Sequence, residues 1–254
     1  MEIRKLNAAR GWIWVKQGYQ LVMHNPLLAI ALALISALVM FAAFKVPVVG
    51  PLLVVLLMPV VMAGYMRVCR ALEEGEEVEL AHLFEGFRKH AARLVALGGF
   101  AILGMVITSI AMISIGGDAF TTLLESFQSS NDPEMLVDAM WAAGTGVVLS
   151  LMVGFVLVFT LMLALQYAPM LVFFSDIPPV VALRASLSGS LRNLVPYTVY
   201  SLIVQAIAIV LGILPYGIGL IVLLPLGLTS LYVSYRNIFP FPGEIVASQP
   251  EPQA

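Results

Sequence analysis

The sequence predicts an all-α membrane protein with six transmembrane helices, forming one membrane domain over residues 1–240. Hydrophobic residues make up 61% of the 254 residues, and charged residues only 11%, against about 25% in soluble domains. Stretches of 18 or more residues without Asp, Glu, Lys or Arg recur along the chain, which is typical of membrane spans. Basic residues are concentrated in alternate loops. This composition excludes a soluble enzyme and a disordered chain.

The first three uncharged stretches each match one span. They cover residues 27–44, 46–66 and 94–117. An α-helix rises about 1.5 Å per residue, so about 20 residues cross a hydrocarbon core roughly 30 Å thick. Beyond the third span, Phe120, Leu123, Leu124 and Phe127 share one helical face. That spacing predicts a short amphipathic helix on the outer surface.

The later uncharged stretches are longer than one span. Residues 139–175 are too long for one straight span and short for two, so a single long helix and a broken one both stay open. Asp132-Pro133-Glu134 is typical of a helix start, which would extend this helix back to residue 133. Residues 193–235 contain Pro215-Tyr216-Gly217 in their middle, which predicts two helices over 194–213 and 217–235.

Loop charge selects six spans over seven. With six spans, 12 of the 13 basic residues lie on one side, and only Lys45 lies on the other. The loop of residues 118–138 on that other side contains five acids and no base. Because cytoplasmic loops carry the excess of Lys and Arg, both termini are expected in the cytoplasm of a bacterial inner membrane. Residues 241–254 are expected to be a disordered cytoplasmic tail.

Three amphipathic segments precede the three predicted hairpins. The first places Trp12, Val15, Tyr19 and Val22 on a face opposite Arg10, Gln17 and His24. The second segment has its apolar face at Leu80, Leu83, Phe84 and Phe87, and the third at Val180, Leu183, Leu187 and Leu191. Such helices lie in the membrane interface with basic residues at headgroup level.

The first and last hairpins match each other by position. The corresponding residues are Asn25, Pro47, Pro59 and Arg70 in one, and Asn193, Pro215, Pro225 and Arg236 in the other. Pro169 is the looser counterpart in the middle hairpin. We therefore expect one unit, an interfacial helix followed by a transmembrane hairpin, used three times as a parallel repeat. Each Pro removes a helical hydrogen bond, which favours a kink over a ligand-facing carbonyl.

The order of several short motifs resembles that of a known family. These motifs are Gly11-Trp12 through Asn25-Pro26, Pro47 with Gly50, Leu83 through Phe87, Tyr167-Ala168-Pro169, the segment 182–193, and Tyr232 through Phe239. Over residues 8–240 the chain resembles uncharacterised six-helix inner-membrane proteins of proteobacteria. These are loosely similar to the membrane-anchor domain of glycerophosphodiester phosphodiesterases. The resemblance implies an inner-membrane helical bundle and no assigned activity.

Six basic residues at the predicted inner interface are candidates for contact with phospholipid headgroups. They are Arg67, Arg70, Lys89, Arg93, Arg184 and Arg192. Guanidinium and ammonium groups at this depth are attracted to anionic lipids. Membrane phospholipids are therefore the expected partners. The net charge of −2 leaves no basic excess for nucleic acid, so a nucleic-acid partner is excluded.

Other polar positions suggest packing or a pathway. Gln166 and Gln205 lie within predicted spans and would line a groove if the chain were a carrier; an interhelical hydrogen bond is the simpler interpretation. A series of small residues, Ala142, Gly146, Ser150 and Gly154, predicts close helix packing inside the chain or a homo-oligomer interface.

The sequence predicts no enzyme, metal or cofactor. The Glu79-Ala-Leu-His82 spacing occurs in helical di-metal sites, but those need several such helices, so a solvated face is favoured. We expect a structural or regulatory protein that organises lipid or a partner membrane protein. The alternatives are a passive or lipid-handling carrier with a groove at the Pro-kinked helices, and an interfacial enzyme using the Glu79, His82, Glu85 and His90 face.

The predicted topology is directly testable. A reporter that is active only in the cytoplasm is expected to function when fused after Ala254, because an even number of spans returns the chain to the side rich in Lys and Arg. The same reporter inserted after Asp118 should be inactive. Six spans would be contradicted if a reporter that works only outside the cytoplasm were active when fused after Ala254.

Overall fold

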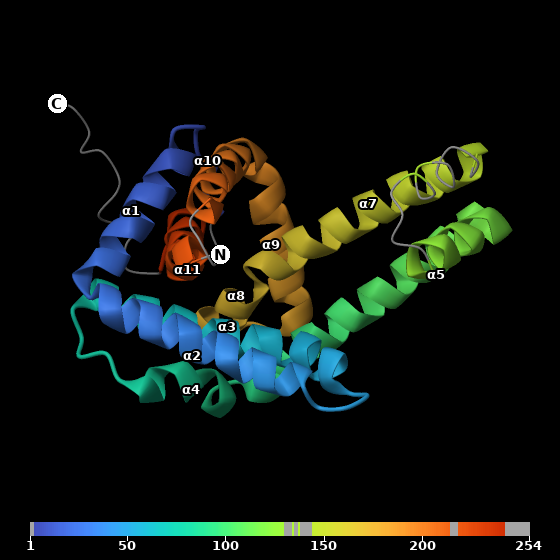
Figure 1. Cartoon of the computed structure of the whole chain (residues 1–254). Helices are drawn as coiled ribbons and strands as arrows, with labels where there is room; N and C mark the ends of the chain where they lie inside the picture. Colours follow the sequence, from blue (N-terminus) through green and yellow to red (C-terminus); the bar gives the residue numbers. More distant parts are fainter. Residues whose placement is uncertain (1–2, 130–133, 135–136, 138–143, 214–217, 242–254) are drawn as a thin grey trace. The chain divides into compact units, whose positions relative to one another are not determined.

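The computed structural model describes residues 3–129, 134, 137, 144–213 and 218–241, and in these ranges the regular secondary structure is helical, with no strand (Figure 1). The helices are α1 (Arg10–His24), α2 (Pro26–Phe44), α3 (Gly50–Glu74), α4 (Leu80–Arg88), α5 (Ala91–Ser129), α7 (Gly144–Gln166), α8 (Ala168–Ser175), α9 (Pro179–Arg192), α10 (Leu194–Gly212) and α11 (Ile218–Ile238). The predicted all-α class is confirmed for this part of the chain.

The predicted single domain contains two compact units. One unit combines Met1–Gly98 with Ala164–Ala254, and the other is Gly99–Leu163. The first unit holds α1 to α4, the start of α5, and α8 to α11. The second is formed by the rest of α5 and most of α7.

Five helical segments in the described residues are long and apolar enough to cross a membrane. They are Pro26–Phe44, Gly50–Glu74, Ala91–Phe127, Gly144–Ser175 and Leu194–Gly212. The sixth predicted span, residues 217–235, corresponds to α11 and is not among these five. The predicted turn at Pro215-Tyr216-Gly217 and the tail after residue 241 lie outside the described residues.

The second span begins later and ends later than predicted. Residues 46–66 were expected, but α3 covers Gly50–Glu74. The loop before it includes Val48 at a φ of 65°, which a helix cannot accommodate. At the other end Gly75 adopts a φ of 69°, and its N–H donates to the Ala71 carbonyl. Gly75 therefore ends α3 as a left-handed C-cap, and the helix extends past the uncharged stretch into charged residues.

The fourth predicted span, residues 139–175, is broken rather than continuous. It divides into α7 and α8 at Tyr167, and Pro169 lies in the first turn of α8. The N–H of Tyr167 donates to the Ser186 Oγ of α9 at 3.0 Å. Proline is accommodated at a helix start because the N–H it lacks would have no partner there. The α7 helix begins at Gly144, with a φ of 71°; the predicted start near Pro133 lies outside the described residues.

Within the second unit, α5 bends where the third span was expected to end. Gly117 has a φ of 57° and a ψ of −149°, which only glycine adopts readily. Beyond the bend, Phe120 and Leu123 are buried with Val147 of α7, while Leu124 and Phe127 stay exposed. The predicted amphipathic face is thus divided between α7 and the exterior.

The three amphipathic helices of the first unit bury small residues together with several large ones, such as Trp14 and Leu83. The buried positions include Gly11 and Gly18 in α1, Gly86 in α4, and Ala182, Ser186 and Gly189 in α9. Larger apolar residues expected to share one face, such as Trp12, Tyr19, Phe84 and Leu191, are exposed. The α1 helix packs on α10 and α11, α4 on α3, and α9 on α8. Small residues at helix contacts with large apolar residues outside are typical of helices surrounded by lipid.

Glycine permits close backbone contact at two of these junctions. A Cβ added to Gly18 would lie 2.7 Å from the backbone nitrogen of Ser230 on α11. A Cβ added to Gly64 of α3 would lie 2.7 Å from the carbonyl carbon of Leu83 on α4. Both distances are shorter than a van der Waals contact, so no other residue fits without moving a helix.

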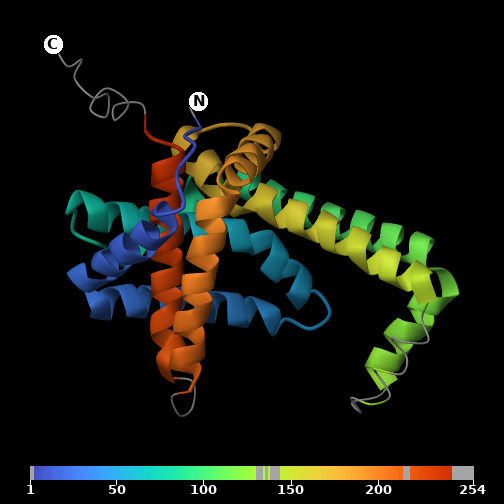
Figure 2. The ribbon, with the colours of Figure 1, turned by 90° about the horizontal axis from the view of Figure 1, so that it is seen from above.

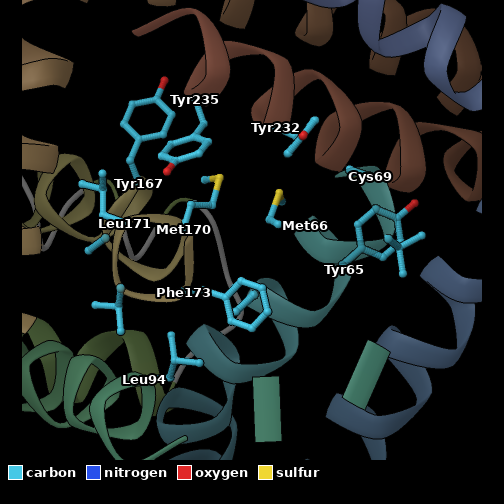
Figure 3. Close-up of a cluster of buried hydrophobic side chains, with 14 of the residues drawn as sticks. Tyr65, Met66, Cys69, Leu94, Tyr167, Met170, Leu171, Phe173, Tyr232 and Tyr235 are labelled. Carbon is cyan, nitrogen blue, oxygen red and sulfur yellow. The ribbon is translucent and has the colours of Figure 1, made fainter. Parts of the chain in front are cut away.

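The core of the first unit combines aliphatic side chains with aromatic and sulfur-containing ones. Tyr65, Met66, Tyr167, Met170 and Tyr235 come from α3, the junction before α8, α8 and α11, and all are buried (Figure 3). In Figure 2, α10 and α11 run side by side, and residues of the two helices contact each other. The Tyr167 and Ser234 hydroxyls are 3.1 Å apart. This core sets the positions of the helix ends that carry charge.

The glycine contacts predict a specific loss of stability. Gly64→Ala should lower the free energy of unfolding by about 1–3 kcal/mol, because its methyl group overlaps the Leu83 backbone. The readout is the thermal unfolding midpoint of the purified full-length protein in detergent. Gly227→Ala in α11 is the control, since nothing lies within 4 Å of an added Cβ there. Equal midpoints for the two variants would contradict the α3–α4 contact.

Candidate functional site

One hollow in the first unit lies among the N-terminal segment, α1, the end of α3 and the end of α11. We call it the arginine pocket, and its volume is about 460 Å³. Its polar lining residues are Arg4, Arg10, Gln17, Gln20, His24, Glu73, Tyr232, Arg236 and Asn237. Its apolar lining residues are Leu6, Leu21, Leu72 and Val233.

The N-terminal segment is held beside this pocket by backbone hydrogen bonds. The N–H of Arg4 donates to the Ile238 carbonyl at 3.0 Å, and that of Leu6 donates to Asn193 Oδ1 at 2.8 Å. Asn193 Nδ2 donates back to the Arg4 carbonyl at 2.9 Å. Asn193 is 1% exposed, so these bonds satisfy a buried amide. They place Arg4 on the pocket wall.

One acid faces three arginines in the pocket. The Glu73 carboxylate accepts from the Tyr232 hydroxyl and from Arg236 Nη1, each at 2.6 Å. Tyr232 and Arg236 are four residues apart on α11 and therefore share a face. With Arg4 and Arg10 added, arginine outnumbers acid by three to one. The described lining therefore carries more basic than acidic side chains.

Arg10 is oriented by Asn237. Arg10 Nη1 donates to Asn237 Oδ1 at 3.3 Å, and Asn237 Nδ2 donates to the Val233 carbonyl at 2.8 Å. The remaining α1 positions, Gln17, Gln20 and His24, occur on the same side of that helix. The polar face that the sequence predicts for α1 is thus a wall of the pocket.

A second hollow lies along α9. Its lining residues are Arg184, Leu187, Ser188, Leu191 and Arg192, and its volume is about 400 Å³. We call it the α9 hollow. Arg184 and Arg192 are exposed, and neither makes an ion pair or hydrogen bond with any residue that the structure describes. Two charged groups thus lie at the ends of an apolar strip.

The other four predicted headgroup residues have partners within the first unit. Arg67 contacts Glu76 at 2.7 Å and Glu85 at 3.5 Å. Arg70 contacts Glu74 at 2.8 Å, and its guanidinium lies 4.6 Å from the Phe241 ring centre. The Lys89 ammonium lies 5.2 Å from the Phe173 ring centre, and Arg93 contacts Asp176 at 2.5 Å. These side chains tie helix ends together.

The Arg67 contact also affects acidity. The hydrogen bond from Arg67 lowers the pKa of the Glu76 carboxyl below its usual value. A carboxyl with a lowered pKa stabilises the folded state above its unfolded pKa, and that contribution is lost as pH falls through the folded pKa. Because Glu76 is at the surface, solvent screens this effect.

The predicted metal-like motif forms a helix cap instead. The Glu79 side chain accepts from the backbone N–H of His82, and His82 Nδ1 accepts from the Glu79 N–H at 3.1 Å. These are the reciprocal bonds of a capping box at the start of α4. His90 lies beside Asp176 at 3.4 Å. Within the described ranges, no group of three or more His, Cys, Asp or Glu could hold a metal ion.

Neither of the predicted groove residues, Gln166 and Gln205, lines the arginine pocket or the α9 hollow. Gln205 is exposed on α10. Gln166 is partly buried at the end of α7, and its Nε2 is buried without a hydrogen-bond partner among the described residues. Pro59 and Pro225 lie inside α3 and α11, whereas Pro169 lies in the first turn of α8.

The small-residue series packs inside the second unit. Ser150 Oγ donates to the Met112 carbonyl at 3.0 Å, and Gly154 lies against the Met112 side chain. A Cβ on Gly146 would lie 3.7 Å from the Ile115 carbonyl oxygen. Ala142 lies outside the described residues. The described members therefore face α5, and their use between chains stays a prediction.

Sequence reasoning missed the arginine pocket. Arg4 and Arg10 come from the start of the chain, Glu73 from the end of α3 and Arg236 from α11, and these three regions are far apart in the sequence. The available signals were the polar face of α1 and the four-residue spacing of Tyr232 and Arg236. Neither signal reveals that Glu73 meets α11.

The chain is similar to a protein described as a "probable inner membrane protein" of Burkholderia thailandensis. The two are 29% identical, and the match covers 94% of each. No family model and no solved structure matches the chain. The expected similarity to the phosphodiesterase membrane anchors finds no support in these comparisons.

The Glu73 contacts predict a measurable contribution to stability. Glu73→Gln should lower the free energy of unfolding by about 1 kcal/mol, because the Tyr232 hydrogen bond loses its charged acceptor and Arg236 loses its ion-pair partner at a partly exposed site. For a chain of this size that corresponds to about 2–4 °C in the thermal midpoint. Glu77→Gln removes the same charge from an exposed residue with no described partner. A Glu73 variant as stable as the Glu77 variant would refute this role.

Proposed function

We propose that this chain is a multi-pass bacterial inner-membrane protein that binds anionic phospholipid headgroups through the α9 hollow. Its work is structural or regulatory: it organises lipid or a partner membrane protein and carries out no catalysis. The observation that carries the proposal is the pair Arg184 and Arg192, both exposed and without a described partner, around an apolar strip.

Membrane insertion is supported by the apolar exterior of the helices. Residues such as Ile110, Met152, Phe155 and Ile209 are more than half exposed although they are strongly apolar. Such surface would aggregate in water but is compatible with lipid. The relative from Burkholderia thailandensis adds support for the inner membrane. We infer six spans, with α11 as the sixth, arranged as three parallel hairpins, and both termini in the cytoplasm.

The α9 hollow has the chemistry of a headgroup contact. Arg184 and Arg192 are eight residues apart, which is about 12 Å along a helix. Leu187 and Leu191 lie between them and can contact the first acyl carbons, while the guanidiniums reach phosphates. Ser188 adds a hydroxyl donor. The four predicted basic residues with internal partners contribute less, since binding lipid would cost those contacts.

Two further proposals remain from the sequence. A passive or lipid-handling carrier is favoured by the buried, unpartnered amide nitrogen of Gln166, which a polar substrate or water could satisfy. The exposed Gln205 does not extend that site. A homo-oligomer through Gly146, Ser150 and Gly154 requires a face that α5 leaves accessible.

Charge removal tests the headgroup contact. The double variant Arg184→Gln, Arg192→Gln should retain at least about tenfold less phosphatidylglycerol, because each basic group near an anionic lipid surface contributes about 1 kcal/mol. Native mass spectrometry of the detergent-purified protein measures the bound lipid. Its matched control is the double variant Lys16→Gln, Arg88→Gln. Both of these bases are exposed, lie outside both hollows and have no partner among the described residues. An equal loss in both double variants would show only a general charge effect and would refute the site.

A further inference from the structure

We propose that the arginine pocket binds a phosphate group, either of a phospholipid headgroup or of a soluble phosphate ester. This is a second site, separate in its lining residues from the α9 hollow. Its walls come from the N-terminal segment, α1, α3 and α11, all in the first unit. A volume of about 460 Å³ is within the range of small-ligand pockets.

The charge balance favours an anion. Arg4, Arg10 and Arg236 contribute three positive charges to the lining, and Glu73 contributes one negative charge. The Glu73 carboxylate already accepts two short hydrogen bonds, so it is not positioned as the group that selects a cation. Among the described lining residues, basic side chains therefore outnumber acidic ones, which favours an anionic group such as a phosphate.

The donor geometry favours phosphate in particular. Guanidinium groups present paired N–H donors that match phosphate oxygens, and the pocket gathers three of them from different segments. The side chains of Gln17 and Gln20 provide further donors from α1 and are exposed to the hollow. Leu6, Leu21 and Leu72 form an apolar border that suits the glycerol or alkyl carbons next to a phosphate.

The positions of two arginines depend on bonds that do not involve the ligand. Arg4 is placed by the backbone bonds to Ile238 and Asn193, and Arg10 is oriented by Asn237. Such preorganisation lowers the entropy lost on binding. The carbonyl of Gln20 accepts from His24 Nδ1, whereas the Gln20 side chain has no hydrogen bond to any described residue. Gln20 can therefore be changed without breaking a known contact.

An isosteric charge change tests the site without unfolding it. Gln20→Glu places one negative charge in the pocket, and Lys16→Gln makes the same change in net charge on α1 outside it. The soluble arm titrates inorganic phosphate and glycerol 3-phosphate into the full-length protein by calorimetry at fixed ionic strength. In the lipid arm, native mass spectrometry compares retained phosphatidylglycerol with phosphatidylcholine. That arm uses chains that also carry Arg184→Gln and Arg192→Gln, so the α9 hollow does not contribute.

The expected result is binding in at least one arm, weakened about three- to tenfold by Gln20→Glu and unchanged by Lys16→Gln. Binding in the soluble arm identifies a phosphate ester as the source, and binding in the lipid arm alone identifies a headgroup. The proposal is overturned if no probe binds at millimolar concentration, or if the two variants bind equally. If Arg184→Gln, Arg192→Gln alone left lipid retention unchanged while binding in this pocket was intact, the proposed function would be refuted but not this site.

Discussion

The close approach of α1 to α11 at Gly18 is the contact on which the described first unit most depends. Thr229 Oγ1 donates to the Gly18 carbonyl at 3.0 Å, and a Cβ on Gly18 would overlap the Ser230 backbone. In lipid, apolar side chains gain little by leaving their solvent, so helices associate through tight packing and hydrogen bonds. Because α1 is held at this distance, its polar face comes to lie across the arginine pocket.

Buried polar groups hold other elements of the first unit together in the same way. Asn193 connects the N-terminal segment to the α9–α10 junction, and Ser186 satisfies the N–H exposed by the break at Tyr167. The Tyr65 hydroxyl donates to the Ala29 carbonyl between α3 and α2. An unsatisfied polar group is costly where water is excluded, so each of these bonds specifies one arrangement of its two elements.

Charged residues are few in this chain, and the arginines among them fall into two groups: those that pair with acids and those that have no described partner. Arg67, Arg70 and Arg93 pair with acids at helix ends, and Arg236 pairs with Glu73 inside the arginine pocket. Arg184 and Arg192 have no such partner among the described residues, and they border a strip of leucines. A paired arginine loses an existing contact when it binds a ligand, whereas an unpaired one does not. The two hollows therefore offer different chemistry: a preorganised pocket and an open surface contact.

The sequence by itself determined the all-α class and the extents of most apolar helices, because these depend on composition and on the spacing of charges along one chain. It also marked the polar face of α1, and it predicted six basic residues for the membrane interface. The tertiary structure decided which of those bases keep a free guanidinium, because that depends on acids such as Glu76 and Asp176 that approach only after folding. It also decided that small residues of α1, α4 and α9 face the protein, and that Glu73 joins α11 in the arginine pocket. Periodicity identifies an apolar face but cannot distinguish lipid from protein as its neighbour, since both are apolar.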